Sequence, residues 1–181
     1  MGTRKVYGIL FDGAWLWEEY VNTLLEDVGE GFEHPRNKSG KGSEWLFRTV
    51  DEFDSFGNKV KSGSLQGKIY PDFIGKDKYN RVIADAKYKP MDNIGNKDYL
   101  QVLAYMFRFD AKKGYYLYPE VGLESDLHLR LNRGVSFEKN VVPRDDISVI
   151  KHGLKIPNDV ENYAEFCEMM DVAEKEFVSG M

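Results

Sequence analysis

The chain contains 181 residues with a formal net charge of −5, and 42% of its residues are hydrophobic. This composition excludes a disordered chain, and no apolar run approaches the ~20 residues of a membrane span, so we expect no membrane partner. Cys167 is the only cysteine, which excludes an intrachain disulfide and a multi-cysteine zinc site and predicts a cytoplasmic protein. The histidines His34, His128 and His152 lack metal-ligand spacing, and we expect them at the surface or in loops.

The charges are distributed unevenly along the chain. Residues 55–113 contain twelve Lys or Arg against six Asp or Glu, whereas residues 159–178 contain seven acids and only Lys175. Two interpretations of this distribution stay open. The charged residues either lie on ordinary solvated faces, or the basic ones form a central surface that faces a polyanion.

The N-terminal third predicts one helix and one strand. A helix is expected over residues 11–31, with Asp12 as N-cap and glycines at its end. Its apolar stripe comprises Leu16, Tyr20, Thr23 and Leu24, widened by Val21 and Leu25. Residues 29–43 are expected to form a loop, residues 44–53 a strand, and residues 54–68 a polar, glycine-rich connection.

The middle of the chain predicts a β-hairpin followed by a helix. Two β-rich runs, residues 68–75 and 81–89, are separated by five polar, turn-like residues. The helix is expected from about residue 96, with Gly114 as its stop. Its predicted apolar face comprises Leu100, Leu103, Met106 and Phe107.

The C-terminal third predicts strands and a closing helix. We expect a buried strand at 114–122, a hairpin over 126–139 that turns at Asn132–Gly134, and a strand at 146–153. The helix over 156–180 would be capped by Asn158 or Asp159, with an apolar face formed by Tyr163, Phe166, Met170 and Phe177. This order of elements predicts an α/β fold with a mixed central sheet flanked by helices.

The predicted hairpin carries carboxylates inside apolar runs, where burial is costly unless the charge is paired or binds a metal. Asp85 and Lys87 are two residues apart on one strand, so they project from the same face. Ala86 points the other way, into the core, although its carbonyl can still lie near a metal. Asp72 follows Pro71 on the neighbouring strand. We therefore expect two carboxylates and an ammonium to meet at one edge of the sheet.

This combination suits hydrolysis of a phosphodiester. Asp72 and Asp85 would hold Mg²⁺, with Mn²⁺ as the alternative, because hard cations prefer oxygen ligands. The metal would lower the pKa of a bound water and screen the charge that builds on the phosphate. Lys87 would orient or help deprotonate that water and stabilise the developing charge.

The stretch "YPDF…VIADAKYK" resembles the motif of PD-(D/E)xK nucleases, with Pro71–Asp72 as its first half and Asp85-Ala86-Lys87 as its second. The resemblance implies a restriction-endonuclease-like fold and a glutamate on the first helix as a further metal ligand. We favour Glu18 for that position, with Glu19 as the fallback, and the Ala86 carbonyl is the remaining candidate ligand.

The helix after the lysine strand extends this resemblance. Its segment "QVLAY" matches the Q-x-x-x-Y pattern of the RecB-like branch. Gln101 and Tyr105 are four residues apart on one helix face, so both can point at the same phosphate or metal-bound water. The resemblance implies a catalytic role for Gln101 and a supporting one for Tyr105.

Residues from about Phe11 to Pro119 are more narrowly similar to McrC-type proteins, the nuclease subunits of McrBC systems that restrict DNA containing modified cytosine. This implies a Mg²⁺-dependent endonuclease that acts on double-stranded DNA with a McrB-like AAA+ GTPase. McrC proteins usually carry a further N-terminal region that contacts the GTPase. Residues 1–181 are therefore expected to form a single nuclease domain, either of a nuclease-only relative or of the C-terminal part of a longer protein.

Two other functions stay open from the sequence. One is a RecB-like exonuclease or repair nuclease with the same site, and the other is a catalytically silent scaffold that binds DNA or a partner. For any of these, the lysines of the basic middle segment are candidate DNA contacts: Lys89, Lys59, Lys61 and Lys68.

Overall fold

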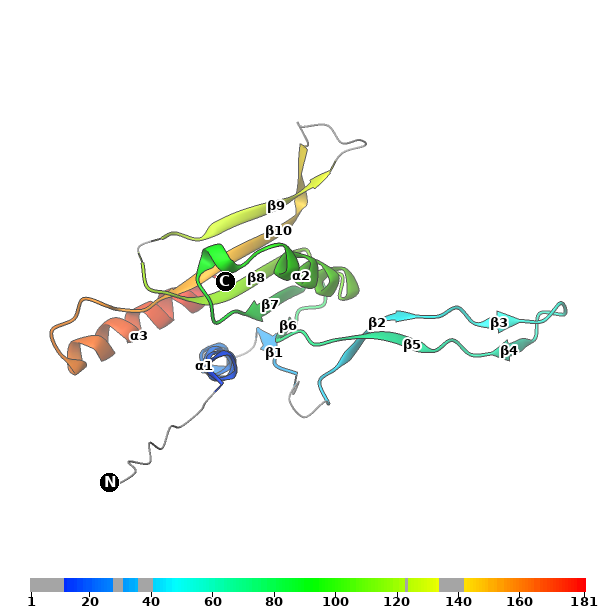
Figure 1. Cartoon of the computed structure of the whole chain (residues 1–181), viewed down its shortest axis with the longest axis horizontal. Coiled ribbons are helices and arrows are strands. Elements are labelled where there is room, and N and C mark those ends of the chain that lie inside the picture. The colour runs from blue at the N-terminus through cyan, green and yellow to red at the C-terminus, as the bar shows by residue number, and fades with distance from the viewer. Residues whose placement is uncertain (1–11, 28–30, 36–40, 123, 134–141) are drawn as a thin grey trace, which may run out of the picture.

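The computed structural model describes residues 12–27, 31–35, 41–122, 124–133 and 142–181. Its centre is a six-stranded sheet with the order β1-β6-β7-β8-β10-β9 (Figure 1). The strands are β1 (Phe32–Glu33), β6 (Phe73–Gly75), β7 (Val82–Ala86), β8 (Lys113–Glu120), β9 (Leu127–Arg133) and β10 (Val142–Lys155).

The sheet is mixed, as predicted. Strands β7, β8 and β10 run parallel to one another, whereas β1–β6, β6–β7 and β9–β10 are antiparallel pairs. The β6–β7 pair is the predicted hairpin, with Phe73 opposite Ala84. Parallel neighbours need a crossover, and the helix α2 (Asn96–Arg108) supplies it between β7 and β8.

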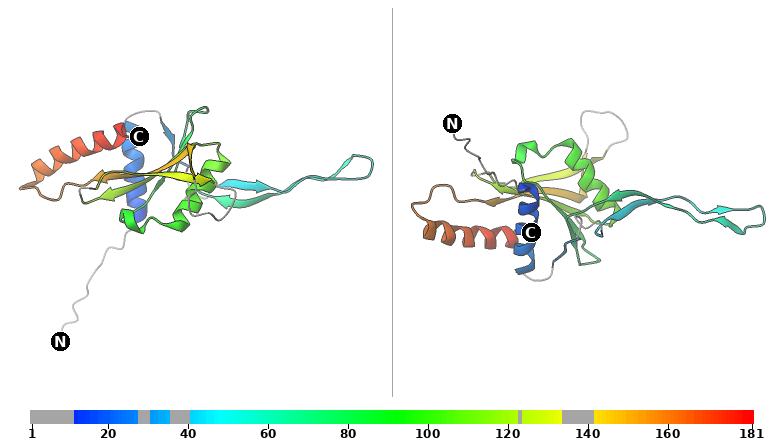
Figure 2. Two further views of the ribbon diagram at one scale, coloured as in Figure 1. Left: turned by 90° about the horizontal axis from the view of Figure 1, so that it is seen from above. Right: turned by 60° about the horizontal axis from the view of Figure 1, so that its bottom comes forward.

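Helices cover both faces of the sheet (Figure 2). The helices α1 (Gly13–Asp27) and α3 (Tyr163–Ser179) lie on one face, and α2 lies on the other. Alternating side chains of β8 pack on opposite faces of the sheet. Tyr115 belongs to the core cluster under α1 and α3, and Tyr116 belongs to the core cluster under α2. The predicted α/β fold, a restriction-endonuclease-like mixed sheet flanked by helices, is thus confirmed.

Helix α1 buries a face that is turned slightly from the predicted one. Asp12 caps it as expected, since its carboxylate accepts the Trp15 N–H at 3.1 Å. Leu16 is 56% exposed, and Trp17 is buried in its place. The Trp17 indole donates to the Leu117 carbonyl at 2.9 Å, which fixes this face against the sheet. The buried residues are Trp17, Val21, Leu24 and Leu25.

The predicted apolar face of α2 is wrong in two of its four positions. Leu100 is 71% exposed and Phe107 is 88% exposed, whereas the buried residues are Asp98, Val102, Tyr105 and Met106. The helix ends at Arg108, and Asp110 then takes a left-handed conformation with φ of 54°. Gly114 is not the stop but part of β8, where an added Cβ would lie 2.7 Å from the Met106 sulfur.

Residues 44–69 form a protruding two-stranded ribbon (Figure 1). Its first half lies in the predicted strand 44–53, whereas most of its second half was predicted as a polar connection, residues 54–68. Strand β2 (Glu44–Arg48) pairs with β5 (Leu65–Ile69), and β3 (Glu52–Phe53) pairs with β4 (Lys59–Lys61). Asp54 closes the tip by accepting the N–H groups of Phe56 and Asn58. The prediction for residues 54–68 failed because glycines and lysines obscured the strand pattern. The short strand β1 likewise lies inside the predicted loop 29–43.

The last elements follow the prediction with shifted limits. Strand β9 pairs antiparallel with β10, which is longer than the predicted 146–153, while residues 134–139 of the predicted hairpin lie outside the described residues. Asn162 caps α3 instead of Asn158 or Asp159, because its side chain accepts the Glu165 N–H at 3.1 Å. Within the described ranges, no helix has the length and apolarity needed to cross a membrane.

His152 is buried, so its predicted surface position is wrong. It lies 2.5 Å from Asp126 through Nδ1 and 2.7 Å from the Phe177 carbonyl through Nε2, and its ring stacks on Phe177. These contacts bind the end of α3 to β10. His128 is exposed, as expected.

The contact of Gly114 with α2 yields a stability prediction. We expect Gly114→Ala to lower the free energy of unfolding by about 1–3 kcal/mol, because the new Cβ would overlap Met106 and Val102 at 2.7 and 2.9 Å. Urea denaturation followed by circular dichroism measures the loss. Gly31→Ala is the control, since its Cβ would meet no atom within 4 Å. Equal stability of the two variants would contradict the packing of α2 on β8.

Candidate functional site

The β6–β7 hairpin brings Asp72 and Asp85 to one place. Asp72 precedes β6 and Asp85 is the fourth residue of β7. The Ala86 N–H donates to the Asp72 carboxylate at 2.9 Å, which directs this side chain toward the end of β7. Asp85 is 1% exposed, whereas Asp72 is only partly buried. The two acids therefore lie at the shared edge that the sequence predicted.

Lys87 follows β7 and reaches back over the same edge. Its backbone N–H donates to the Leu117 carbonyl at 2.8 Å, which extends the line of the strand by one residue. Its ammonium contacts the Asp85 carboxylate in an ion pair and donates to Gln101 Oε1 at 3.2 Å. Lys87 thus connects the hairpin with α2.

Helix α2 contributes Gln101 and Tyr105 to one hydrogen-bonded chain. The Gln101 amide donates to the Tyr105 hydroxyl at 2.7 Å, and this hydroxyl donates to the Tyr70 carbonyl at 3.2 Å. The i, i+4 spacing that the sequence singled out therefore places both residues beside Lys87. The chain fixes α2 against the segment that leads into Asp72.

Helix α1 presents Glu18 to the hairpin. The negative charge of Glu18 contributes to raising the pKa of Asp72, so the two carboxylates are close enough to repel each other. Glu19 is mainly exposed and accepts the Trp15 indole N–H at 2.8 Å. Of the two glutamates, Glu18 is the less exposed, and its charge is the one that contributes to raising the pKa of Asp72.

His34 lies in the loop after β1, within the prediction of a surface or loop position, but it also takes part in this site. Its Nδ1 is 2.9 Å from the Asp72 carbonyl, and its ring stacks on Phe73. Its Nε2 is 3.8 Å from Glu18 and 3.9 Å from Glu19. The sequence carried no signal for this placement, because it depends on the pairing of the two-residue strand β1 with β6.

Asp98 is a second residue that the sequence reasoning missed. It is 9% exposed, and its carboxylate lies 2.7 Å from the Lys89 ammonium and 3.7 Å from that of Lys87. It also accepts the Gly95 N–H at 2.9 Å, so it belongs to the cap of α2. An acid three residues after a helix N-cap was the signal that could have identified it.

Of the other predicted DNA contacts, only Lys89 joins this group, through Asp98. Lys89 is held by Asp98, as described above. On the ribbon, Lys59 forms an ion pair with Asp51 at 2.6 Å and Lys61 forms one with Glu52 at 2.8 Å. Lys68 lies over the Trp45 ring, 5.3 Å from its centroid. The ribbon lysines therefore form a separate set that projects away from the sheet (Figure 1).

The carboxylates are held in a repulsive arrangement. Burial, followed by the charges of Asp85 and Glu18, raises the pKa of Asp72 well above its ordinary value. Burial also raises the pKa of Asp85, although Lys87 opposes the effect. Burial alone would lower the pKa of Lys87, but the surrounding carboxylates, Asp85 first, outweigh it and raise that pKa. One ammonium thus compensates several acids.

The donor chemistry of this group fits a hard divalent cation. Carboxylate and carbonyl oxygens are the ligands that Mg²⁺ and Mn²⁺ accept, and a cation would relieve the repulsion that raises the pKa of Asp72. Among the described residues, no three Asp, Glu, His or Cys side chains are gathered closely enough to surround an ion. The ion pair of Lys87 with Asp85 is the contact that a cation would have to replace.

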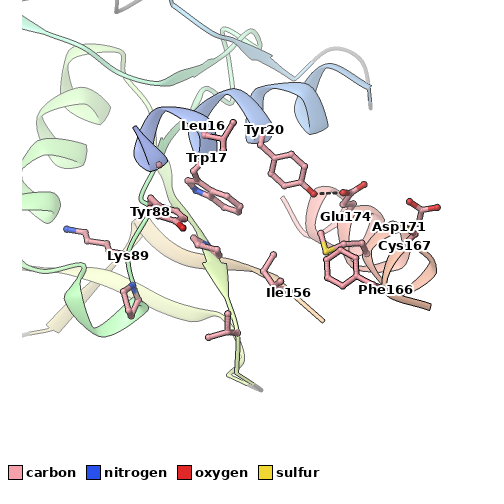
Figure 3. A pocket seen from close by; sticks show the side chains of 15 residues that line it. Leu16, Trp17, Tyr20, Tyr88, Lys89, Ile156, Phe166, Cys167, Asp171 and Glu174 are labelled. Atoms are coloured by element: carbon pink, nitrogen blue, oxygen red, sulfur yellow. Dashed lines mark hydrogen bonds between the residues drawn. The ribbon is translucent and has the colours of Figure 1, made fainter. Parts of the chain in front are cut away.

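A larger hollow, of about 920 Å³, lies on the α1–α3 side and is separate from this group (Figure 3). It is lined mainly by apolar and aromatic residues, among them Trp17, Tyr88 and Phe166. The Tyr20 hydroxyl donates to Glu174 across it. None of the paired acids of the hairpin lines this hollow, so we assign no chemistry to it.

One comparison with known proteins bears on this arrangement. The family model described as McrBC 5-methylcytosine restriction system component matches residues 1–119. The matched range contains α1, the ribbon, the hairpin and α2, and therefore every residue of the site described above. No curated protein matches the chain.

The raised pKa of Asp72 predicts how stability depends on pH. A group with a raised folded-state pKa stabilises the protein below its unfolded pKa, about 4, and loses this contribution as pH rises through the folded value. In EDTA, we expect Asp72→Asn to have the wild-type melting temperature near pH 4 and a higher one at pH 7.5. Thermal denaturation at both pH values measures this.

Asp54→Asn is the matched control for that experiment. The pKa of Asp54 is lowered, mainly by its hydrogen bonds with Asn58, so its contribution to stability is present at neutral pH and lost on acidification. This variant should show no gain in melting temperature over the wild type at pH 7.5. A drop in melting temperature for Asp72→Asn at pH 7.5 would instead mark Asp72 as a structural residue.

Proposed function

Because the chain belongs to the McrBC family of 5-methylcytosine restriction system components, we propose that it is the subunit that cuts DNA, a Mg²⁺-dependent endonuclease of the PD-(D/E)xK type. The observation that carries the proposal is the convergence of Asp72, Asp85 and Lys87 at one hairpin edge, between Glu18 of α1 and Gln101 of α2. Burying several acids costs stability, and a fold accepts that cost most readily at a functional site.

Asp72 and Asp85 would hold the divalent cation, with Glu18 and the Ala86 carbonyl as further oxygen ligands. When bound, such an ion lowers the pKa of a coordinated water and offsets the negative charge that develops on the phosphate. Mn²⁺ can take the place of Mg²⁺ with the same donors. The raised pKa of Asp72 implies that this site loads more readily as pH rises.

Lys87 would act as a cation toward the phosphate. Its raised pKa keeps it protonated at neutral pH, so it can donate to a phosphate oxygen and stabilise the charge of the transition state. Gln101 and Asp98 are alternative acceptors, at 3.2 and 3.7 Å, for its ammonium. Lys87 can therefore leave Asp85 without becoming an unpaired charge.

We further propose that the substrate is double-stranded DNA in the cytoplasm and that a McrB-like AAA+ GTPase is the partner. The family match supports the partnership, because it names the restriction system of which such proteins are components. Lys59, Lys61, Lys68 and Lys89 remain candidate phosphate contacts. Exposed ion pairs such as those of Lys59 and Lys61 contribute little stability, so a phosphate can replace their carboxylate partners.

Cleavage of DNA tests the proposed site directly. With Mg²⁺, GTP, the McrB-like subunit and closed circular DNA containing 5-methylcytosine, we expect Asp85→Asn and Lys87→Ala each to lower the cleavage rate by at least about 10²–10³-fold, since each removes a group that stabilises developing charge. Gel analysis of nicked and linear products gives the rates.

Asp77→Asn serves as the control, because Asp77 lies in the exposed turn of the same hairpin. Unchanged cleavage by both site variants would show that this hairpin is not the catalytic site, and absence of cleavage by the wild type would identify a silent scaffold. Degradation of linear DNA only, with circular DNA left intact, would instead identify an exonuclease.

Salt dependence tests the ribbon lysines. If Lys59 and Lys61 each neutralise one phosphate, the double variant Lys59→Ala/Lys61→Ala should bind DNA with a weaker salt dependence. The slope of log binding constant against log salt concentration should decrease in magnitude by about 2. Fluorescence anisotropy with a labelled duplex in Ca²⁺, which supports binding without cleavage in many Mg²⁺ nucleases, measures the slope. An unchanged slope would mean that these lysines do not contact phosphates and only form ion pairs within the ribbon.

A further inference from the structure

Tyr116 on β8 carries a buried hydroxyl that the fold does not use. The residue is 0% exposed, and its hydroxyl has no hydrogen-bond partner among the described residues. Leaving such a group unsatisfied costs about 1–3 kcal/mol, so phenylalanine would be the better residue for packing alone. A buried polar group without a partner calls for a functional explanation.

Tyr116 is the direct neighbour of Asp85 in the sheet. The two residues are register partners in the parallel β7–β8 ladder, so their side chains stand side by side on the face that α2 covers. The Oδ2 atom of Asp85 pairs with the Lys87 ammonium, which is the contact that holds this carboxylate. A donor without a hydrogen-bond partner among the described residues and an acceptor that depends on one ion pair therefore occupy paired positions on adjacent strands.

The surroundings keep the Tyr116 hydroxyl available as a donor. Burial, followed by the charges of Asp85 and Asp98, raises its pKa, so the phenol stays protonated at any pH at which the protein works. The Tyr99 ring lies 6.0 Å away, in a tilted arrangement that holds the Tyr116 ring in place. The hydroxyl thus has a fixed position and a proton to donate.

We propose that Tyr116 is a positioning residue for the cleavage reaction, and that its hydroxyl donates a hydrogen bond to the Asp85 carboxylate when a divalent cation displaces the Lys87 ammonium from it. This inference rests on the proposed function. Lys87 has Gln101 and Asp98 as alternative partners, whereas Asp85 loses its ion-pair partner when Lys87 leaves. Tyr116 then orients the carboxylate that faces the cation, as outer hydrogen bonds do for metal ligands generally.

Tyr115 offers a matched control on the same strand. Its hydroxyl donates to the Met181 carbonyl at 2.7 Å, and its ring belongs to the opposite face of the sheet. The substitution of tyrosine by phenylalanine should therefore affect stability at one position and ion binding at the other. Tyr115→Phe removes a hydrogen bond and should lower the melting temperature without altering ion binding, whereas Tyr116→Phe removes only an unsatisfied hydroxyl.

The experiment measures Mn²⁺ binding by calorimetry and the melting temperature in EDTA for both variants. We expect Tyr116→Phe to weaken Mn²⁺ binding by about 10–100-fold while the melting temperature stays the same or rises. The Mg²⁺ concentration for half-maximal cleavage should increase by a similar factor. Such a split between ion affinity and stability does not arise from a packing role.

Two results would overturn the proposal: Mn²⁺ affinity within about 2-fold of the wild type, or a melting temperature that falls as it does for Tyr115→Phe. Asp85→Asn separates this failure from that of the proposed function. If Asp85→Asn abolishes Mn²⁺ binding and Tyr116→Phe leaves it unchanged, only the role of Tyr116 is wrong. If neither variant alters binding, the hairpin is not a cation site and both proposals fail.

Discussion

The ion pair between Lys87 and Asp85 is the contact around which the site is organised. It is the only ion pair that Asp85 makes within the described residues, and it lies among acids that repel one another. Such a pair is costly to bury, and removing one partner leaves an uncompensated charge. The Lys87 ammonium can also leave Asp85, because Gln101 and Asp98 lie close enough to accept it. An ion pair with a purely structural role would not require such alternative acceptors.

The three layers of the fold meet around this pair and the neighbouring Asp72. The hairpin supplies the acids and the lysine, α1 approaches with Glu18 on one face, and α2 brings Gln101 and Asp98 on the other. Short contacts hold each layer in place: Trp17 donates to the β8 backbone, and Tyr105 donates to the segment before Asp72. The sheet therefore positions residues that are far apart in the sequence without placing any of them on a long loop.

The sequence revealed the parts of the site that depend on local spacing. Alternation along one strand placed Asp85 with Lys87, and helical spacing placed Gln101 with Tyr105. It missed His34 and Tyr116 because their positions follow from strand pairing across the sheet, which no local pattern records. The error on α2 has a similar origin, since the exposed Leu100 and Phe107 are as apolar as the residues that face the sheet. The mixed sheet itself was predicted because its strands and helices alternate along the chain.

The ribbon, residues 44–69, and the central sheet should differ greatly in local stability. Its side chains include Val50, Phe56 and Val60, which are 87%, 88% and 63% exposed, and of its residues, all of them described, only Ile69 at its base packs against a core cluster. A two-stranded ribbon with so little burial is only marginally stable by itself. Its backbone amides should exchange with solvent through local opening, whereas those of β7 and β8 should exchange only when the whole domain unfolds. A protease would accordingly nick the chain first within residues 44–69 and leave the sheet, with the buried Asp85 on it, as a trimmed core.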